Sequence, residues 1–238
     1  MDQRKKITGP EPDKLVTQLQ PDSFLAESYR KICLNLMGHD EEKELGRVIM
    51  MTSSVPCEGV SLTTANIAVV LAQSGQRTLL LEVNFRHPTQ EQTFRDFLPG
   101  IPHAYLCDFL SDGTKPEPQE LLPSLWAVFS GRRLGPLQYY FLGKHLRHLL
   151  KQYRTEYDFI LMDMPAALPV PETASLAGIV DEIILVVAAD RVTPREAMAA
   201  RARLEKAGGK IKGAILNSVR HSSDSGYKDY EYYNTDYD

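Results

Sequence analysis

A short turn of small residues carries the strongest chemical signal in this sequence. The apolar run VIMMTS leads into SVPCEGVS at residues 54–61, and LTTAN then begins a helix-like segment. A strand, a small-residue turn and a helix N-terminus together gather backbone N–H groups and a helix dipole, which favours phosphate binding. In such a loop a lysine reaches the β- and γ-phosphates, and a Ser or Thr hydroxyl ligates Mg²⁺. Gly59 and Ser61 occupy the expected positions, whereas Ser54 replaces the first glycine and Val60 replaces the lysine.

Acidic and amide side chains follow two later apolar runs. The first continues as LLLEVNFRHP, with Glu82, Asn84 and Arg86, and the second as ILMDMPA, with Asp163. An acid that leaves an apolar strand opposite a phosphate loop can hold Mg²⁺ through water. We therefore expect Ser61 and Asp163 at a metal site, and Asp163, Asn84 and Glu82 at the catalytic positions. Glu82 and Asn84 are equally consistent with ordinary polar strand ends.

The elements that must position these residues alternate along the chain. Six apolar runs are candidate buried strands: residues 47–52, 77–83, 125–130, 158–162, 182–187 and 211–216. Segments with helical spacing lie between them: residues 61–73, 137–154, 172–179 and 194–206. Apolar strands without strict alternation, separated by amphipathic helices, predict an α/β fold with a doubly wound, mostly parallel sheet covered on both faces. Such sheets bind ligands at the carboxyl ends of their strands.

Three segments lie outside this pattern. Residues 1–22 carry three prolines and many charges, so we expect a mobile N-terminal segment before a helix that Ser23 caps and that runs to about Met37. Residues 98–123 contain five prolines and predict an irregular excursion. Residues 223–238 are acidic and tyrosine-rich, which predicts a disordered tail. The expected α/β domain therefore spans residues 23–222.

The bulk composition restricts the possible functions. A chain of 238 residues with 43% hydrophobic and 24% charged residues suits one large soluble domain, and a net charge of −4 argues against a nucleic-acid binder. Three widely spaced cysteines (Cys33, Cys57 and Cys107) predict reduced thiols. The longest aliphatic stretch, residues 183–189, is far short of the ~20 residues of a membrane helix. We expect a cytoplasmic protein that reaches the membrane through a partner.

Taken together, the motifs resemble those of the bacterial tyrosine kinases of capsule and exopolysaccharide export, which have a P-loop ATPase fold related to MinD and ParA. In that family the loop reads roughly TSxxPxEGKSTTxxN, a second motif LLIDxDxRxP and a third IIxDxPP. A helix before the core carries ExxRxxR, and the chain ends in a tyrosine cluster. The corresponding segments here are TSSVPCEGVSLTTAN, LLLEVNFRHP and ILMDMPA, followed by the acidic tail. The helix motif matches through Glu27 and Arg30, with Cys33 in place of the second arginine.

The resemblance implies a set of roles. It implies ATP or ADP with Mg²⁺, bound by Ser54, Glu58, Gly59, Val60, Ser61, Leu62, Arg86 and Asn217, the last at the position of the family's adenine-contacting asparagine. It implies phosphorylation of the tail tyrosines, Tyr227, Tyr230, Tyr232, Tyr233 and Tyr237, although an acidic tail could serve solubility alone. It also implies that Glu27 and Arg30 contact a neighbouring subunit in a homo- or hetero-oligomer. An ordinary exposed helix pair explains those two residues equally well.

The departures from the family pattern affect residues that have chemical roles in that family. Val60 replaces the lysine, Glu82 and Asn84 replace two aspartates, and Ala166 replaces a proline. A charge-assisted hydrogen bond is worth about 1.5–3 kcal/mol, so losing the lysine alone weakens nucleotide binding roughly tenfold to a hundredfold. Asn84 can ligate a metal but cannot act as a base.

These departures lead to three hypotheses. The first is a catalytically impaired regulatory or scaffold subunit that docks on a transmembrane polysaccharide co-polymerase and is phosphorylated by an active paralogous kinase. The second is an active autokinase that takes the missing charge from Arg86, from the pair Arg132 and Arg133, or from a neighbouring subunit. The third is a MinD- or ParA-like positioning ATPase. It would require a basic patch or an amphipathic C-terminal helix, and the acidic tail supplies neither.

Overall fold

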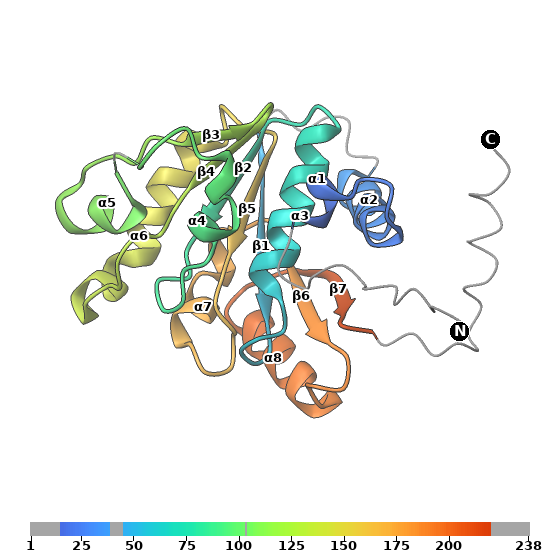
Figure 1. Cartoon of the computed structure of the whole chain (residues 1–238). Helices are drawn as coiled ribbons and strands as arrows, with labels where there is room; N and C mark the ends of the chain where they lie inside the picture. The colour runs from blue at the N-terminus through green and yellow to red at the C-terminus, as the bar shows by residue number, and fades with distance from the viewer. Residues whose placement is uncertain (1–14, 39–44, 103, 220–238) are drawn as a thin grey trace, which may run out of the picture.

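A seven-stranded sheet forms the centre of the protein (Figure 1). The computed structural model describes residues 15–38, 45–102 and 104–219. The strand order is β3-β4-β2-β5-β1-β6-β7, and only the edge strand β3 runs antiparallel to its neighbour. The strands are β1 (Arg47–Ser53), β2 (Thr78–Glu82), β3 (Gln119–Leu122), β4 (Leu125–Val128), β5 (Phe159–Asp163), β6 (Glu182–Ala188) and β7 (Ile211–Asn217).

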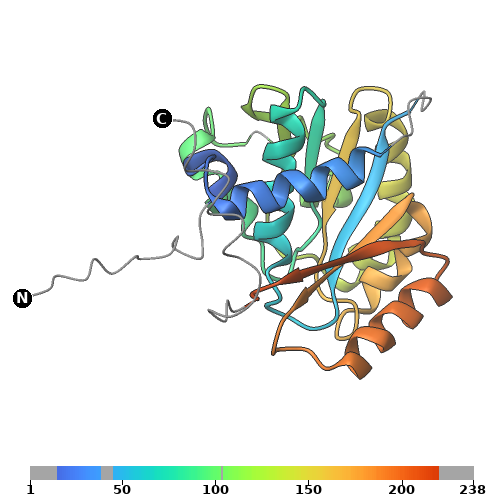
Figure 2. The ribbon, with the colours of Figure 1, turned by 90° about the vertical axis from the view of Figure 1, so that its right-hand side faces the viewer.

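Helices cover both faces of this sheet (Figures 1 and 2). One face carries α1 (Val16–Leu19), α2 (Phe24–Met37), α3 (Val60–Gln73) and α4 (Gln90–Thr93). The other carries α5 (Leu106–Asp112), α6 (Pro136–Tyr153), α7 (Pro171–Ser175) and α8 (Pro194–Lys206). Two short 3₁₀ turns, η1 (Arg95–Phe97) and η2 (Ala177–Ile179), complete the described elements. The predicted doubly wound α/β fold is confirmed.

The alternation of side chains along each strand divides the core into two layers. Val48 and Met50 of β1 pack in the layer of α6 and α8, whereas Ile49 and Met51 pack in the layer of α2 and α3. The same period of two places Leu80 and Leu161 in the α3 layer. The next residues of that parity on β2 and β5 are Glu82 and Asp163, so both acids extend toward α3.

The six predicted strands and the predicted helices are present to within about two residues at most ends. Ser23 caps α2, because its hydroxyl accepts the Ala26 N–H at 3.2 Å. The predicted irregular excursion at residues 98–123 is wrong in part, since α5 and β3 form within it. β3 is only four residues long and exists through antiparallel pairing with β4, and such tertiary pairing leaves little trace in a proline-rich sequence.

The structure also describes residues 15–22, which belong to the segment predicted to be mobile. Leu15 and Val16 are buried in the α3 layer. Thr17 binds α3 directly: its N–H and hydroxyl donate to Asn66 Oδ1 at 3.0 and 2.8 Å. These hydrogen bonds join α1 to α3 across 49 residues of the sequence.

Candidate nucleotide site

Gly59 shapes the loop between β1 and α3, which the sequence predicts to bind phosphate. Gly59 is the N-cap of α3 and has φ = 85°, in the left-handed region that favours glycine. A Cβ atom at this position would lie 2.3 Å from Asn217 Nδ2, at the end of β7. Asn217 Nδ2 donates to the Glu58 carbonyl at 2.9 Å. Asn217 thus contacts the loop. Position 59 favours glycine for two reasons, the positive φ and the close approach of Asn217 Nδ2.

Glu58 fixes the loop from within. Its Oε1 accepts the N–H groups of Ser54 and Val55, both at 2.9 Å, and its Oε2 accepts the Ala188 N–H at the end of β6, also at 2.9 Å. The carboxylate is buried, so each of these charge-assisted bonds forms away from water. Two backbone donors of the loop are therefore satisfied by the protein's own acid.

Val60 occupies the first turn of α3 and is 8% exposed. Its side chain packs in the core layer formed by α1, α2 and α3. Leu62, two residues along the helix, is half-buried. The position at which a P-loop presents an amine to phosphate is here filled by a branched aliphatic side chain that contributes to the core.

Glu82 and Asp163 lie opposite each other on the adjacent parallel strands β2 and β5. Glu82 accepts four hydrogen bonds in the interior. Its Oε1 accepts the N–H groups of Thr89 (2.7 Å) and Gln90 (2.9 Å), and its Oε2 accepts the Ser130 N–H (3.1 Å) and hydroxyl (2.9 Å). Glu82 thereby joins β2 to the start of α4 and to the end of β4. Four donors at one carboxylate indicate a structural role.

Asp163 is fully buried and poorly satisfied. Its Oδ2 accepts Gln90 Nε2 at 2.6 Å, while Oδ1 has no hydrogen-bond partner. Burial, followed by the charge of Glu82, raises the pKa of Asp163 to about 7, against the lowering effect of hydrogen bonds from Gln90 and Ser61. Ser61 therefore lies beside Asp163, and their joint role at a metal site stays a prediction.

The two remaining residues of the second motif point elsewhere. Asn84 Oδ1 accepts the His87 N–H at 3.2 Å, which closes a local turn. Arg86 pairs with Glu172 of α7 at 3.2 Å, and its guanidinium lies 5.8 Å from the ring centre of Tyr139. Neither side chain joins the cluster of Ser61 and Asp163 in this structure.

Sequence reasoning missed Gln90. This residue is completely buried between α3 and β5, although it lies in the polar stretch HPTQEQT. Its Nε2 donates to the Ser61 carbonyl at 2.9 Å as well as to Asp163. A glutamine among polar neighbours gives no signal of burial, so only the fold could have revealed it.

The residues of the predicted helix motif on α2 lie partly on the surface and partly in the core. Glu27 and Arg30 form an exposed ion pair of 3.0 Å on α2. Cys33 faces inward, where its thiol lies 3.7 Å from the Ile67 carbonyl of α3 and burial raises its pKa to about 12. The five predicted phosphorylation sites, Tyr227, Tyr230, Tyr232, Tyr233 and Tyr237, lie outside the described residues.

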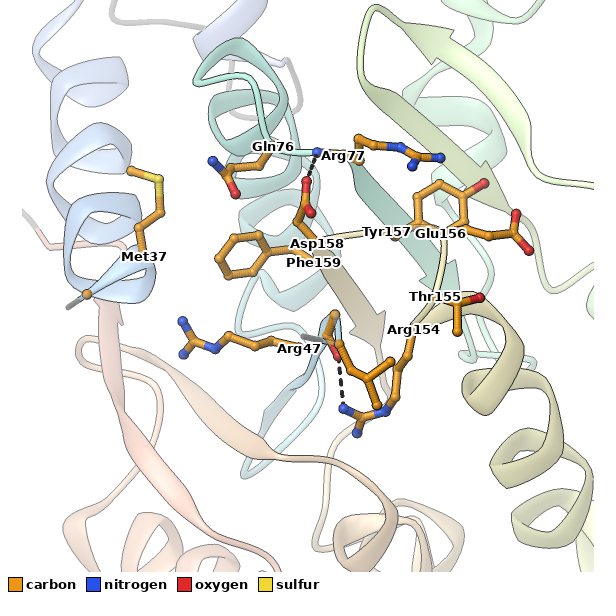
Figure 3. A pocket seen from close by; sticks show the side chains of 13 residues that line it. Met37, Arg47, Gln76, Arg77, Arg154, Thr155, Glu156, Tyr157, Asp158 and Phe159 are labelled. Carbon is orange, nitrogen blue, oxygen red and sulfur yellow. Dashed lines mark hydrogen bonds between the residues drawn. The ribbon is translucent and has the colours of Figure 1, made fainter. Parts of the chain in front are cut away.

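A pocket of about 360 Å³ lies at the opposite end of the sheet (Figure 3). It is lined by residues at the amino ends of β1, β2 and β5 and at the end of α6, among them Arg47, Arg77 and Arg154. Arg47 pairs with Glu182 at 2.6 Å, and Arg154 pairs with Asp181 at 2.7 Å. The guanidinium groups of Arg47 and Arg154 are therefore already paired with acids, and that of Arg77 lies 5.8 Å from the ring centre of Tyr157. The pocket is remote from the β1–α3 loop.

Known proteins that are similar in sequence and in structure share the fold described above. No family model matches the chain. It is 28% identical over 241 residues to the tyrosine-protein kinase YwqD of Bacillus subtilis (strain 168), which covers 93% of this chain and 91% of YwqD. The solved BceF tyrosine kinase domain is 28% identical, with a TM-score of 0.73, and the match covers 88% of this chain and 84% of that domain. The chain is a homologue of the bacterial tyrosine kinases.

Two further similarities extend this relationship. ExoP of Rhizobium meliloti (strain 1021), a succinoglycan biosynthesis transport protein, is 26% identical over 220 residues, covering 89% of this chain but 27% of ExoP. The septum site-determining protein MinD of Pyrococcus horikoshii, solved with Mg-ADP, has a TM-score of 0.61 at 22% identity, covering 75% of this chain and 72% of MinD. The second likeness shows that this tyrosine kinase homologue has the P-loop fold of MinD.

Proposed function

We propose that this chain is a tyrosine-kinase-like subunit that has lost efficient phosphate transfer and regulates or scaffolds exopolysaccharide or capsule assembly. In this proposal it docks on a transmembrane co-polymerase, and an active paralogous kinase phosphorylates its tail tyrosines. The observation that carries the proposal is Val60, which is packed in the core at the position of the phosphate-binding amine.

The electrostatics of the loop support loss of transfer. Phosphoryl transfer depends on neutralising the charge that develops on the γ-phosphate. Glu58 within the β1–α3 loop, and Glu82 and Asp163 at the ends of β2 and β5, are buried carboxyl groups, and the lysine that would oppose them is absent from the loop sequence. A polyanionic nucleotide meets less positive potential here than in a loop with its lysine.

The proposed substitute charge donors are placed less well than an active kinase requires. Arg86 is held by Glu172 and by the face of Tyr139. Arg132 is 69% exposed and lies 4.0 Å from Asp108, on the α5 side of the molecule. An active autokinase would have to break the pair of Arg86 and Glu172 before that arginine could reach a phosphate.

The role in polysaccharide assembly rests on the relatives. ExoP is a succinoglycan biosynthesis transport protein, and YwqD is a tyrosine-protein kinase. None of the helices in the described part of the chain has the length and apolarity to cross a membrane. A membrane partner is therefore the route by which we propose that the chain reaches the export machinery.

Transfer of labelled γ-phosphate tests the proposal directly. The purified full chain is incubated with Mg-ATP, alone and with the kinase domain of an active relative. We expect no labelling of the chain alone and labelling in the presence of the active domain, which is lost when the five tail tyrosines are changed to phenylalanine. Autolabelling at the rate of the active domain would refute the proposal.

The Val60→Lys variant is the matched test of the loop. Restoring the amine should increase affinity for ADP by roughly tenfold to a hundredfold, the value of one charge-assisted hydrogen bond. Fluorescent-nucleotide titration measures this, and Val60→Met serves as an uncharged control of similar length. Equal affinity in the lysine and methionine variants would show that Val60 is not what limits binding.

A further inference from the structure

Gln90 lies between the two residues that a P-loop protein uses to hold its divalent cation. Its side chain is completely buried, and Nε2 donates both to Asp163 Oδ2 at 2.6 Å and to the Ser61 carbonyl at 2.9 Å. Ser61 and Asp163 offer oxygen ligands of the kind that Mg²⁺ prefers. The Gln90 amide thus donates to one carboxylate oxygen of Asp163 and to the backbone carbonyl of Ser61, the residue whose hydroxyl is the expected ligand.

We infer that the Gln90 amide takes the place of the divalent cation, so that the loop of this chain is built without a metal site. This deepens the proposed loss of phosphate transfer, because it removes a second source of positive charge from the same loop. It explains why a buried carboxylate is tolerated beside Glu82: an N–H donor is directed at it from α4.

The position of Gln90 is imposed by Glu82. The carboxylate of Glu82 accepts the backbone N–H groups of Thr89 and Gln90, which fixes the first turn of α4 against the end of β2. That turn then directs the Gln90 side chain toward Asp163. Glu82, where the family has an aspartate, thus holds the start of α4, and Gln90 from that turn contacts Asp163.

Magnesium does not fit this arrangement. Mg²⁺ requires near-octahedral oxygen ligands at about 2.0–2.1 Å, and the Gln90 N–H donor at 2.6 Å already uses Asp163 Oδ2, one of the two oxygens that could face the ion or its water. Asp163 Oδ1 and Gln90 Oε1 accept no hydrogen bond from the described part of the protein. No group of three or more His, Cys, Asp or Glu side chains in the described part of the chain could hold a metal ion instead.

Binding of Mn²⁺, followed by electron paramagnetic resonance with and without ADP, tests this inference on the full chain. The informative variants are Gln90→Met, which keeps the volume and removes the donor, and Gln90→Glu, which keeps the shape and adds an oxygen ligand. Gln92→Met, at an exposed position on the same helix, is the control. We expect no bound Mn²⁺ in the native chain or the control, and an affinity at least roughly tenfold higher in both Gln90 variants.

Two results would overturn the inference: Mn²⁺ bound by the native chain as tightly as by the Gln90 variants, or no gain in either variant. Thermal unfolding gives a second readout, since a gained site should raise the melting temperature of the Gln90 variants by about 2–4 °C in excess Mn²⁺. Failure here is distinguishable from failure of the proposed function. A chain that labels its tail without binding Mn²⁺ refutes the function and leaves Gln90 in its role, whereas an unlabelled chain that binds Mn²⁺ does the reverse.

Discussion

Glu82 and Asp163 lie side by side on β2 and β5, both buried, and differ sharply in how they are satisfied. Glu82 accepts four hydrogen bonds, whereas Asp163 has one oxygen without a partner. Two carboxylates that lie side by side repel each other when both are ionised. Asp163, which accepts fewer hydrogen bonds than Glu82, therefore retains its proton to higher pH. Burial first, and the charge of Glu82 second, raise the pKa of Asp163 to about 7.

The first prediction concerns pH and Asp163. Because its pKa is about 7 in the folded protein and 3.8 in its ordinary state, the folded chain binds more protons than the unfolded chain between about pH 4 and pH 7. The contribution of Asp163 to the free energy of unfolding is therefore fully present below about pH 4. It is lost as the pH rises through about 7. Asp163→Asn, which stays neutral, should raise stability at pH 8 by about 1–3 kcal/mol and change it little at pH 4. Urea unfolding at both pH values measures the difference, and an equal effect at the two would contradict the raised pKa.

The second prediction concerns the reach of Glu82. Glu82→Asp preserves the charge but shortens the side chain, so it cannot contact both the start of α4 and Ser130. We expect a loss of about 2–3 kcal/mol, from donors left unsatisfied in the interior. Hydrogen exchange at the Thr89 and Gln90 amides should accelerate more than exchange within β5. Unchanged protection at those two amides would show that Glu82 does not anchor α4.

The third prediction concerns the close approach of Gly59 to Asn217. Gly59→Ala introduces a Cβ at φ = 85° and 2.3 Å from Asn217 Nδ2, and we expect a cost of about 1–3 kcal/mol. Asn217→Ala removes the obstructing amide, so the double variant should recover the part of the cost that is steric. A double-mutant cycle from thermal unfolding separates the two contributions. Strict additivity would place the whole cost in backbone strain.

The fourth prediction concerns the attachment of α1. Thr17→Val removes the hydroxyl that donates to Asn66 Oδ1 while keeping the shape of the side chain. We expect a loss of about 1–2 kcal/mol, and a coupling with Asn66→Ala of about 0.5–1.5 kcal/mol. Thr93→Val on α4 is a matched control, since its hydroxyl donates only to the local Thr89 carbonyl. Similar losses in the two variants would argue against a specific tie between α1 and α3.

Local pattern alone was sufficient for most of the sheet. The apolar runs around Val48, Leu80, Leu161 and Val186 are long enough to bury both faces of a strand, and this property needs no knowledge of their neighbours. The loop before α3 was equally readable, because Gly59 in a strand–turn–helix context has few alternative structures. The edge strand β3 was not readable, since its four residues are held by pairing with β4.

The sequence by itself determined the fold class, the position of the phosphate loop and the absence of its lysine, because each depends on residue type and local spacing. Only the tertiary structure decided what occupies the site. Gln90 is 73 residues from Asp163 along the chain. Their contact exists because β2 and β5 are adjacent strands and α4 packs on the face of the sheet toward which Asp163 extends. The loss of the lysine can be seen in the sequence, whereas the Gln90 amide that contacts Asp163 is found only where distant segments meet in the interior.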